Sequence, residues 1–121
     1  MKKVLIVDDA SVVRLLIKKI LKQSDDFTII GEATNGKDAL IKYKELRPDV
    51  VTMDMIMPEA DGIQATKDIL AFDEDAKVVI ISSIDQKEML IQAINAGASS
   101  YIVKPFESDR VISTLNEVLN N

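Results

Sequence analysis

Five side chains that could carry chemistry stand where predicted buried strands end. They are Asp8, Asp9, Asp54, Ser82 and Lys104. Because the carboxyl ends of parallel strands meet at one edge of a sheet, we expect these side chains to lie close together. Three carboxylates, a hydroxyl and an ammonium group can hold a hard divalent cation and can neutralise the oxygens of a phosphoryl group.

The three carboxylates require a counter-charge. Two carboxylates about 4 Å apart repel by roughly 4 kcal/mol at an effective dielectric of about 20. Mg2+ suits such a site, because it takes oxygen ligands and retains waters and a substrate oxygen. A carboxylate in this setting can also act as the nucleophile and become an aspartyl phosphate. The residues themselves therefore predict Mg2+-dependent phosphoryl transfer.

Each of these residues has a simpler explanation when it is taken alone. An aspartate after a strand commonly caps a helix or forms a turn. A lone Ser82 would be an ordinary loop or cap residue, and a lone Lys104 would be an ordinary surface lysine. Their coincidence at neighbouring strand ends is what favours a functional site.

The hydrophobic pattern alternates between short β-rich runs and stretches with apolar residues at helical spacing. The predicted strands cover residues 4–7, 27–31, 50–54, 77–81 and 101–103. The predicted helices cover residues 11–23, 39–46, 63–70, 88–96 and 108–119, and Ser108 is expected to cap the last one. Five such units predict an α/β fold, a (βα)5 doubly wound parallel five-stranded sheet with helices on both faces. The second strand delivers only Glu32 and Ala33, so we expect it at the edge.

The composition excludes several classes of function. The chain has no Cys, no His and no Trp, and its 15 basic and 20 acidic residues give a net charge of −5. Disulfides, Cys-based metal sites, His-containing catalytic triads and a phosphohistidine on this chain are therefore excluded. Because an acidic chain binds phosphate backbones poorly, we expect no nucleic-acid partner.

The sequence shows no targeting or membrane segment. The apolar run Val4–Val7 is far shorter than that of a signal peptide, and no stretch approaches the roughly 20 apolar residues that span a bilayer. We therefore expect a cytoplasmic protein with no membrane partner. Since no linker or low-complexity tract divides the chain, we expect a single domain over residues 1–121.

Four segments resemble, in order and spacing, the receiver domain of two-component response regulators. They are Val4–Asp9, Met53–Pro58 followed by Gly62, Ile81–Ser83 and Tyr101–Phe106. The resemblance covers essentially the whole chain and is greatest for the single-domain receivers of chemotaxis. It implies a flavodoxin-like sheet with strand order 2-1-3-4-5, Mg2+ as cofactor, and a monomer. It also implies a protein that is no enzyme beyond its own phosphorylation and dephosphorylation.

The resemblance implies a role for each acidic residue of the site. Asp54 would accept the phosphoryl group from a sensor histidine kinase. Asp9 and Asp54 would bind Mg2+ through their side chains. Ile56 would add its backbone carbonyl as a ligand, and Asp8 would act mainly through a bound water.

Three further residues would switch the molecule. Ser82 and Lys104 would bond to the phosphoryl oxygens, and Lys104 would pair with Asp54 before phosphorylation. Tyr101 would change rotamer between an exposed and a buried position, and the Lys104–Pro105 peptide bond would be cis. The face built from the fourth helix, fifth strand and fifth helix would then change shape and bind an output partner. On or near that face lie Gln86, Glu88, Gln92, Tyr101 and Lys104.

Ile56 and Ile84 depart from the polar residues that enterobacterial receivers have at these positions. They stand two residues past Asp54 and two past Ser82, where side chains flank the phosphoryl group and tune the attacking water. Because an isoleucine side chain cannot orient a water, we expect slow hydrolysis of the aspartyl phosphate. Slow hydrolysis would leave room for a separate phosphatase.

The resemblance implies that the output partner is a flagellar motor switch in a bacterium or an adaptor of the archaellum in an archaeon.

A stand-alone relay receiver, which passes the phosphoryl group to a phosphotransfer protein, is an alternative. A Mg2+-dependent phosphohydrolase is another, but its haloacid-type form needs Asp-x-Asp after the first strand, and here Asp8 and Asp9 are adjacent. Since the sequence ends at Asn121, directly after the fifth helix, we expect no DNA-binding output domain.

Overall fold

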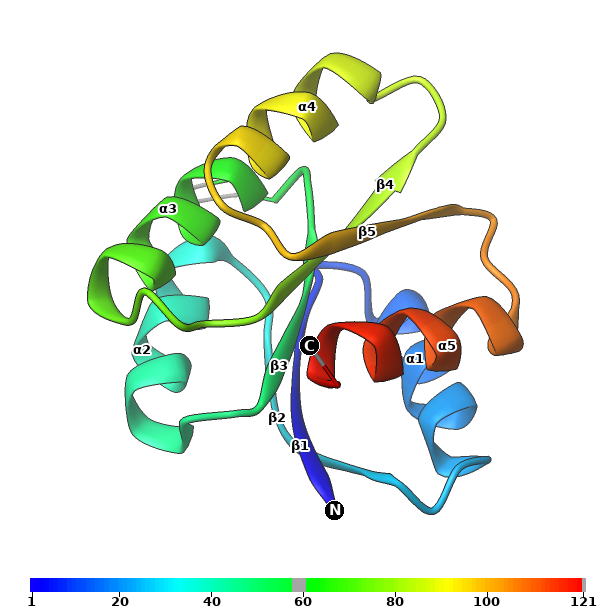
Figure 1. Cartoon of the computed structure of the whole chain (residues 1–121). Helices are drawn as coiled ribbons and strands as arrows, with labels where there is room; N and C mark the ends of the chain where they lie inside the picture. The colour runs from blue at the N-terminus through cyan, green and yellow to red at the C-terminus, as the bar shows by residue number, and fades with distance from the viewer. Residues whose placement is uncertain (58–60, 121) are drawn as a thin grey trace.

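A five-stranded parallel sheet lies between two layers of helices in the computed structural model, which describes residues 1–57 and 61–120 (Figure 1). The strands are β1 (Lys2–Val7), β2 (Phe27–Ala33), β3 (Val50–Asp54), β4 (Val78–Ser83) and β5 (Ser100–Lys104). The helices are α1 (Ser11–Lys22), α2 (Gly36–Leu46), α3 (Gly62–Phe72), α4 (Lys87–Asn95) and α5 (Ser108–Leu119). The sheet order is β2-β1-β3-β4-β5, and every pair is parallel. The predicted fold class and strand order are confirmed, with β2 at one edge.

Two hydrophobic clusters lie on opposite faces of the sheet, one beneath α2, α3 and α4 and the other beneath α1 and α5 (Figure 1). Strand β1 shows the alternation, because Leu5 and Val7 belong to the first cluster and Val4 and Ile6 to the second. A parallel sheet that is covered on both faces buries most residues of its inner strands, which explains why these strands are rich in apolar residues on both faces. Among the described residues, no helix is long and apolar enough to cross a membrane.

The start of α5 differs from the prediction. Glu107 has an extended backbone, with φ −101° and ψ 154°, and is the N-cap residue, but its side chain makes no capping hydrogen bond. Helical geometry therefore begins at Ser108, whose side chain lies inside the first turn and cannot act as the cap. The predicted Ser108 cap is wrong by one residue. The expected cis bond between Lys104 and Pro105 is present.

Gly62 brings the start of α3 against the end of β3. Its N–H donates to the carbonyl oxygen of Met55 at 2.8 Å. A Cβ atom at Gly62 would overlap the backbone carbonyl oxygen of Asp54 and would stand 2.9 Å from the Met55 Cα. Only glycine lets the two backbones approach so closely. The backbone of Asp54 is therefore fixed by packing as well as by the sheet.

Gly62→Ala is expected to lower the free energy of unfolding by about 2 kcal/mol or more, because an added methyl group meets backbone that cannot move aside. Urea denaturation followed by circular dichroism measures the change. Gly31→Ala is the matched control, because its methyl group would meet the flexible end of the Leu46 side chain and, at an ordinary contact distance, the Leu5 side chain, but no backbone. We expect the control to cost less than about 1 kcal/mol, and equal losses in both variants would contradict this explanation.

Candidate functional site

The three predicted acidic residues meet at the carboxyl edge of the two central strands. Asp8 and Asp9 follow β1, and Asp54 ends β3. One carboxylate oxygen from each of the three lies within 4.8 Å of the other two. The Nζ atom of Lys104, at the end of β5, lies 3.3 Å from Oδ1 of Asp54. Four of the five predicted side chains, those of Asp8, Asp9, Asp54 and Lys104, therefore lie together in the structure. The expected pair of Asp54 and Lys104 is among their contacts.

Ser82, near the end of β4, lies at the same carboxyl edge of the sheet. It directly follows Ile81, which pairs with Asp54 across the β3–β4 ladder. The Ser82 side chain is buried, and within residues 1–57 and 61–120 its hydroxyl has no hydrogen-bond partner. Because buried hydroxyls are nearly always bonded, this one is available to a group that is added to the site.

The carboxylates differ in how they are held. Asp8 is 1% exposed and Asp54 is 8% exposed, whereas Asp9 is open to solvent. The Ala10 N–H donates to Oδ1 of Asp8 at 2.9 Å, but Oδ2 of Asp8 is buried without a partner among the described residues. A buried carboxylate oxygen without a partner is costly, and a hard cation would satisfy it. The donor set therefore fits Mg2+.

Burial raises the pKa of both buried carboxyl groups, because desolvation penalises their charged form. For Asp54, the positive charge of Lys104 opposes the increase in pKa. For Asp8, the Ala10 N–H opposes the increase and the neighbouring Asp54 carboxylate adds to it. In the metal-free protein, ionised carboxylates are thus held together at a cost that a bound cation would offset.

The two isoleucines that depart from the receiver pattern lie on the loops after β3 and β4. Ile56 is 55% exposed and Ile84 is 85% exposed. Ile56 borders a hollow that residues 85–89, at the start of α4, also line. Both side chains are thus apolar and solvent-facing beside the strand ends that carry Asp54 and Ser82.

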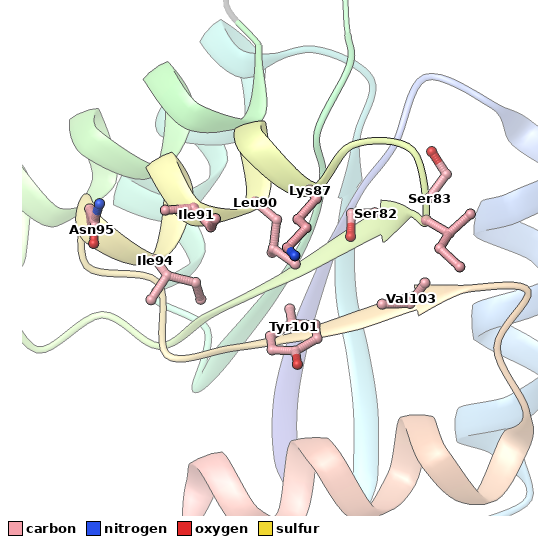
Figure 2. A pocket seen from close by; sticks show the side chains of 10 residues that line it. Ser82, Ser83, Lys87, Leu90, Ile91, Ile94, Asn95, Tyr101 and Val103 are labelled. Atoms are coloured by element: carbon pink, nitrogen blue, oxygen red, sulfur yellow. The ribbon is translucent and has the colours of Figure 1, made fainter.

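A pocket of about 410 Å3 lies between α4 and the ends of β4 and β5 (Figure 2). Figure 2 shows Leu90, Ile91 and Ile94 of α4 around the same groove as Tyr101 and Val103 of β5. Ser82, Ser83, Ile84, Lys87 and Asn95 complete its lining. Tyr101 is 41% exposed, and its predicted change of rotamer stays a prediction.

The residues predicted for the partner face differ in their exposure and in whether they line the pocket. Gln92 and Glu88 are exposed on α4 and do not line the pocket. Gln86 is partly buried, and its side-chain oxygen accepts the Ser83 N–H at 2.8 Å. Sequence reasoning missed Ile91, which lines the pocket and is half exposed. The signal that could have found it is an apolar residue outside the buried stripe of a short helix.

Comparison with known proteins gives a consistent result. Residues 4–116 match the family model described as the response regulator receiver domain. The chain is 50% identical over 117 residues to the chemotaxis protein CheY of Thermotoga maritima, and the match covers 97% of both chains. The response regulator domain of Thermotoga maritima CheB superimposes with a TM-score of 0.92 at 31% identity, over 100% of this chain and 98% of that one. A structure described as the CheX-CheY-BeF3-Mg+2 complex from Borrelia burgdorferi gives a TM-score of 0.90 at 34% identity, over 97% of this chain and 88% of that one.

Asp8→Asn is expected to stabilise the metal-free protein at pH 7 by on the order of 1 kcal/mol, because it removes a buried charge. The raised pKa of Asp8 determines the sign of this change in stability and its dependence on pH. Such a carboxyl group contributes stability below the pKa of the unfolded chain and loses it as the pH rises through the folded-state pKa. The gain should therefore vanish as the pH falls to the ordinary range of aspartate. Urea denaturation in EDTA at a series of pH values measures it.

The control for this experiment is Glu117→Gln, which removes an exposed carboxylate of α5. It should leave the free energy of unfolding within about 0.5 kcal/mol of the wild type at every pH. Added Mg2+ should stabilise the wild type more than it stabilises Asp8→Asn. An Asp8→Asn protein that is less stable than the wild type at pH 7 without metal would contradict this electrostatic account.

Proposed function

The chain belongs to the response regulator receiver domain family, and from this premise we propose that residues 1–121 form a phosphorylation-activated switch of a two-component system. Asp54 is the phosphoacceptor in this proposal. The observation that carries it is the position of the buried Asp54 carboxylate, which has an oxygen within 4.8 Å of two other acids and another contact, at 3.3 Å, with the ammonium group of Lys104. A cation on one side and an ammonium group on the other would neutralise the oxygens of an incoming phosphoryl group.

The proposed cofactor is Mg2+, held by the side chains of Asp9 and Asp54 and by the backbone carbonyl of Ile56. Asp8 would act through a bound water. When bound, Mg2+ supplies positive charge that neutralises the carboxylates and the transferring phosphoryl oxygens. The buried Oδ2 atom of Asp8, which has no partner among the described residues, supports this assignment, because a water bound to the cation could donate a hydrogen bond to it. The similar CheY of Borrelia burgdorferi, which was solved with Mg2+ and BeF3, supports it as well.

The proposed transfer is a displacement at phosphorus. An oxygen of the Asp54 carboxylate forms a bond to the phosphorus of a phosphohistidine, while the P–N bond breaks and its electron pair leaves with the imidazole. Since this chain has no His, the donor histidine belongs to a sensor kinase. Lys104, which pairs with Asp54 at 3.3 Å, then binds a phosphoryl oxygen in place of the carboxylate.

Phosphorylation would change the partner face through Ser82 and Tyr101. The phosphoryl group adds up to about two negative charges and three acceptor oxygens. Ser82, whose buried hydroxyl has no partner among the described residues, donates to one of these oxygens. Its movement opens space on the pocket side, and Tyr101 turns inward. A partner that prefers this form by about 1.4 kcal/mol binds about ten times more tightly after phosphorylation.

The proposed biological setting is chemotaxis, in the cytoplasm, with a monomeric switch that acts on a flagellar motor switch or an archaellum adaptor. The 50% identity to the CheY of Thermotoga maritima over 97% of both chains supports this setting. The partner would read the face that carries Gln86, Gln92 and Tyr101. No nucleic-acid or membrane partner belongs to the proposal.

Incubation with Mg2+ and acetyl phosphate should add one phosphoryl group to the wild type and none to Asp54→Ala, as intact-mass spectrometry would show. The reason is that, among residues 1–57 and 61–120, Asp54 is the carboxylate that lies beside two other acids and forms an ion pair with Lys104. EDTA should abolish the mass gain in the wild type. A wild type without any gain, or an Asp54→Ala protein that gains as fast, would contradict the proposal.

The double substitution Ile56→Asn with Ile84→Glu should shorten the lifetime of the aspartyl phosphate, because polar side chains can orient the attacking water. A barrier that is lower by about 1.4 kcal/mol would shorten the lifetime about tenfold. Decay of the phosphorylated mass after removal of the donor measures it. Ile41→Asn changes an exposed isoleucine on α2 and should leave the lifetime unchanged. An unchanged lifetime in the double variant would show that Ile56 and Ile84 do not set the rate, and with it the case for a separate phosphatase would weaken.

A further inference from the structure

A charged network at the carboxyl end of β2 joins the edge strand to α1 and α2. The carboxylate of Glu32 accepts from Nε of Arg14 and from Nζ of Lys18, both at 3.0 Å. The backbone carbonyl of Glu32 accepts from Nζ of Lys42. The side chains of Arg14 and Glu32 are 17% and 34% exposed. Arg14 is therefore the more enclosed partner of the pair.

Arg14 makes a second contact that its neighbour Lys18 does not make. Its Nη1 donates to the backbone carbonyl oxygen of Asp8 at 2.8 Å. This carbonyl is half of the peptide bond between Asp8 and Asp9. The orientation of that peptide plane determines where the Cα and side chain of Asp9 lie. Arg14 thus reaches from the edge of the sheet to the backbone of the acidic pair.

The Asp9 carboxylate depends on its backbone more than the other two carboxylates do. Asp8 accepts from the Ala10 N–H, and Asp54 pairs with Lys104. In the part of the chain that the structure describes, no side chain or N–H bonds the carboxylate of Asp9, which is exposed. Among the described residues, the contacts that fix its position are therefore those of its own backbone.

We propose that Arg14 is a positioning residue, which fixes the peptide between Asp8 and Asp9 and so places the exposed Asp9 carboxylate to bind a divalent cation with the other two. The planar guanidinium suits this task, because one edge can bind Glu32 while Nη1 remains free for the carbonyl. Lysine has a single ammonium group on a flexible chain and cannot bind both Glu32 and the Asp8 carbonyl in the fixed geometry of a guanidinium group. The role in phosphorylation rests on the proposed function, since that role needs Asp9 as a ligand of Mg2+.

Positioning and simple electrostatics predict opposite effects when the charge of Arg14 is removed. Loss of a cation near three carboxylates should by itself strengthen the binding of Mg2+. Loss of the hydrogen bond to the Asp8 carbonyl should weaken it, because Asp9 is then no longer held. The sign of the change in Mg2+ affinity therefore separates the two explanations.

The first experiment measures the dissociation constant of Mg2+ by calorimetry for the wild type, Arg14→Met, Arg14→Lys and Lys18→Met. We expect about tenfold weaker binding in both Arg14 variants, which is the loss commonly seen when a residue that orients a metal ligand is removed. Lys18→Met is the matched control, since Lys18 binds the same Glu32 carboxylate at the same distance without touching Asp8. It should bind Mg2+ at least as tightly as the wild type. The rate of acetyl phosphate labelling of Arg14→Met should recover at saturating Mg2+.

The second experiment needs neither metal nor phosphorylation. Heteronuclear NOE values for the Asp9 and Ala10 amides of the metal-free protein should fall in both Arg14 variants and remain as in the wild type in Lys18→Met. Unchanged amides, unchanged or tighter Mg2+ binding in the Arg14 variants, or an equal loss in Lys18→Met would each overturn the proposal. A wild type that does not bind Mg2+ would instead overturn the proposed function, and the amide values would still decide whether Arg14 holds the peptide.

Discussion

Repulsion among three carboxylates at the carboxyl edge of the sheet is the constraint that the rest of the structure must satisfy. Their oxygens lie within 4.8 Å of one another, and one ammonium group, that of Lys104, lies 3.3 Å from Asp54. A loosely packed edge would let the carboxylates separate. Here Asp8 follows a strand that pairs with β3 from Val4 and Val50 through Val7 and Met53. Because both faces of these strands are buried, core packing holds like charges together.

The same edge contains polar atoms that the described residues leave without partners. These are the Oδ2 atom of Asp8 and the hydroxyl of Ser82, and both are buried. Such groups are rare in folded proteins, and each needs a physical explanation. A cation and a phosphoryl group together supply positive charge for the first and an acceptor for the second. This pairing is why the proposed chemistry follows from the site and not only from membership of the family.

Much of this arrangement could be predicted from the sequence, because periodicity identifies the strands and a parallel topology places their carboxyl ends together. The cap of α5 could not, since it depends on the backbone angles of Glu107. The contact of Arg14 with Asp8 and Glu32 depends on how α1 packs beside the edge strand, which no local pattern reveals. The pocket was missed because an apolar residue in a helix is usually assigned to the core, whereas Ile91 is half exposed.

The two margins of the sheet are secured differently. At β2, three cationic side chains bind the single residue Glu32. At the opposite margin, Tyr101 and Val103 of β5 border an open pocket. The β2 margin is therefore tied to α1 and α2 by ionic contacts and hydrogen bonds, whereas the β5 margin borders the pocket. In the proposed switch, a rearrangement that begins at Asp54, at the end of β3, would meet ionic contacts toward β2 and the space of the pocket toward β5.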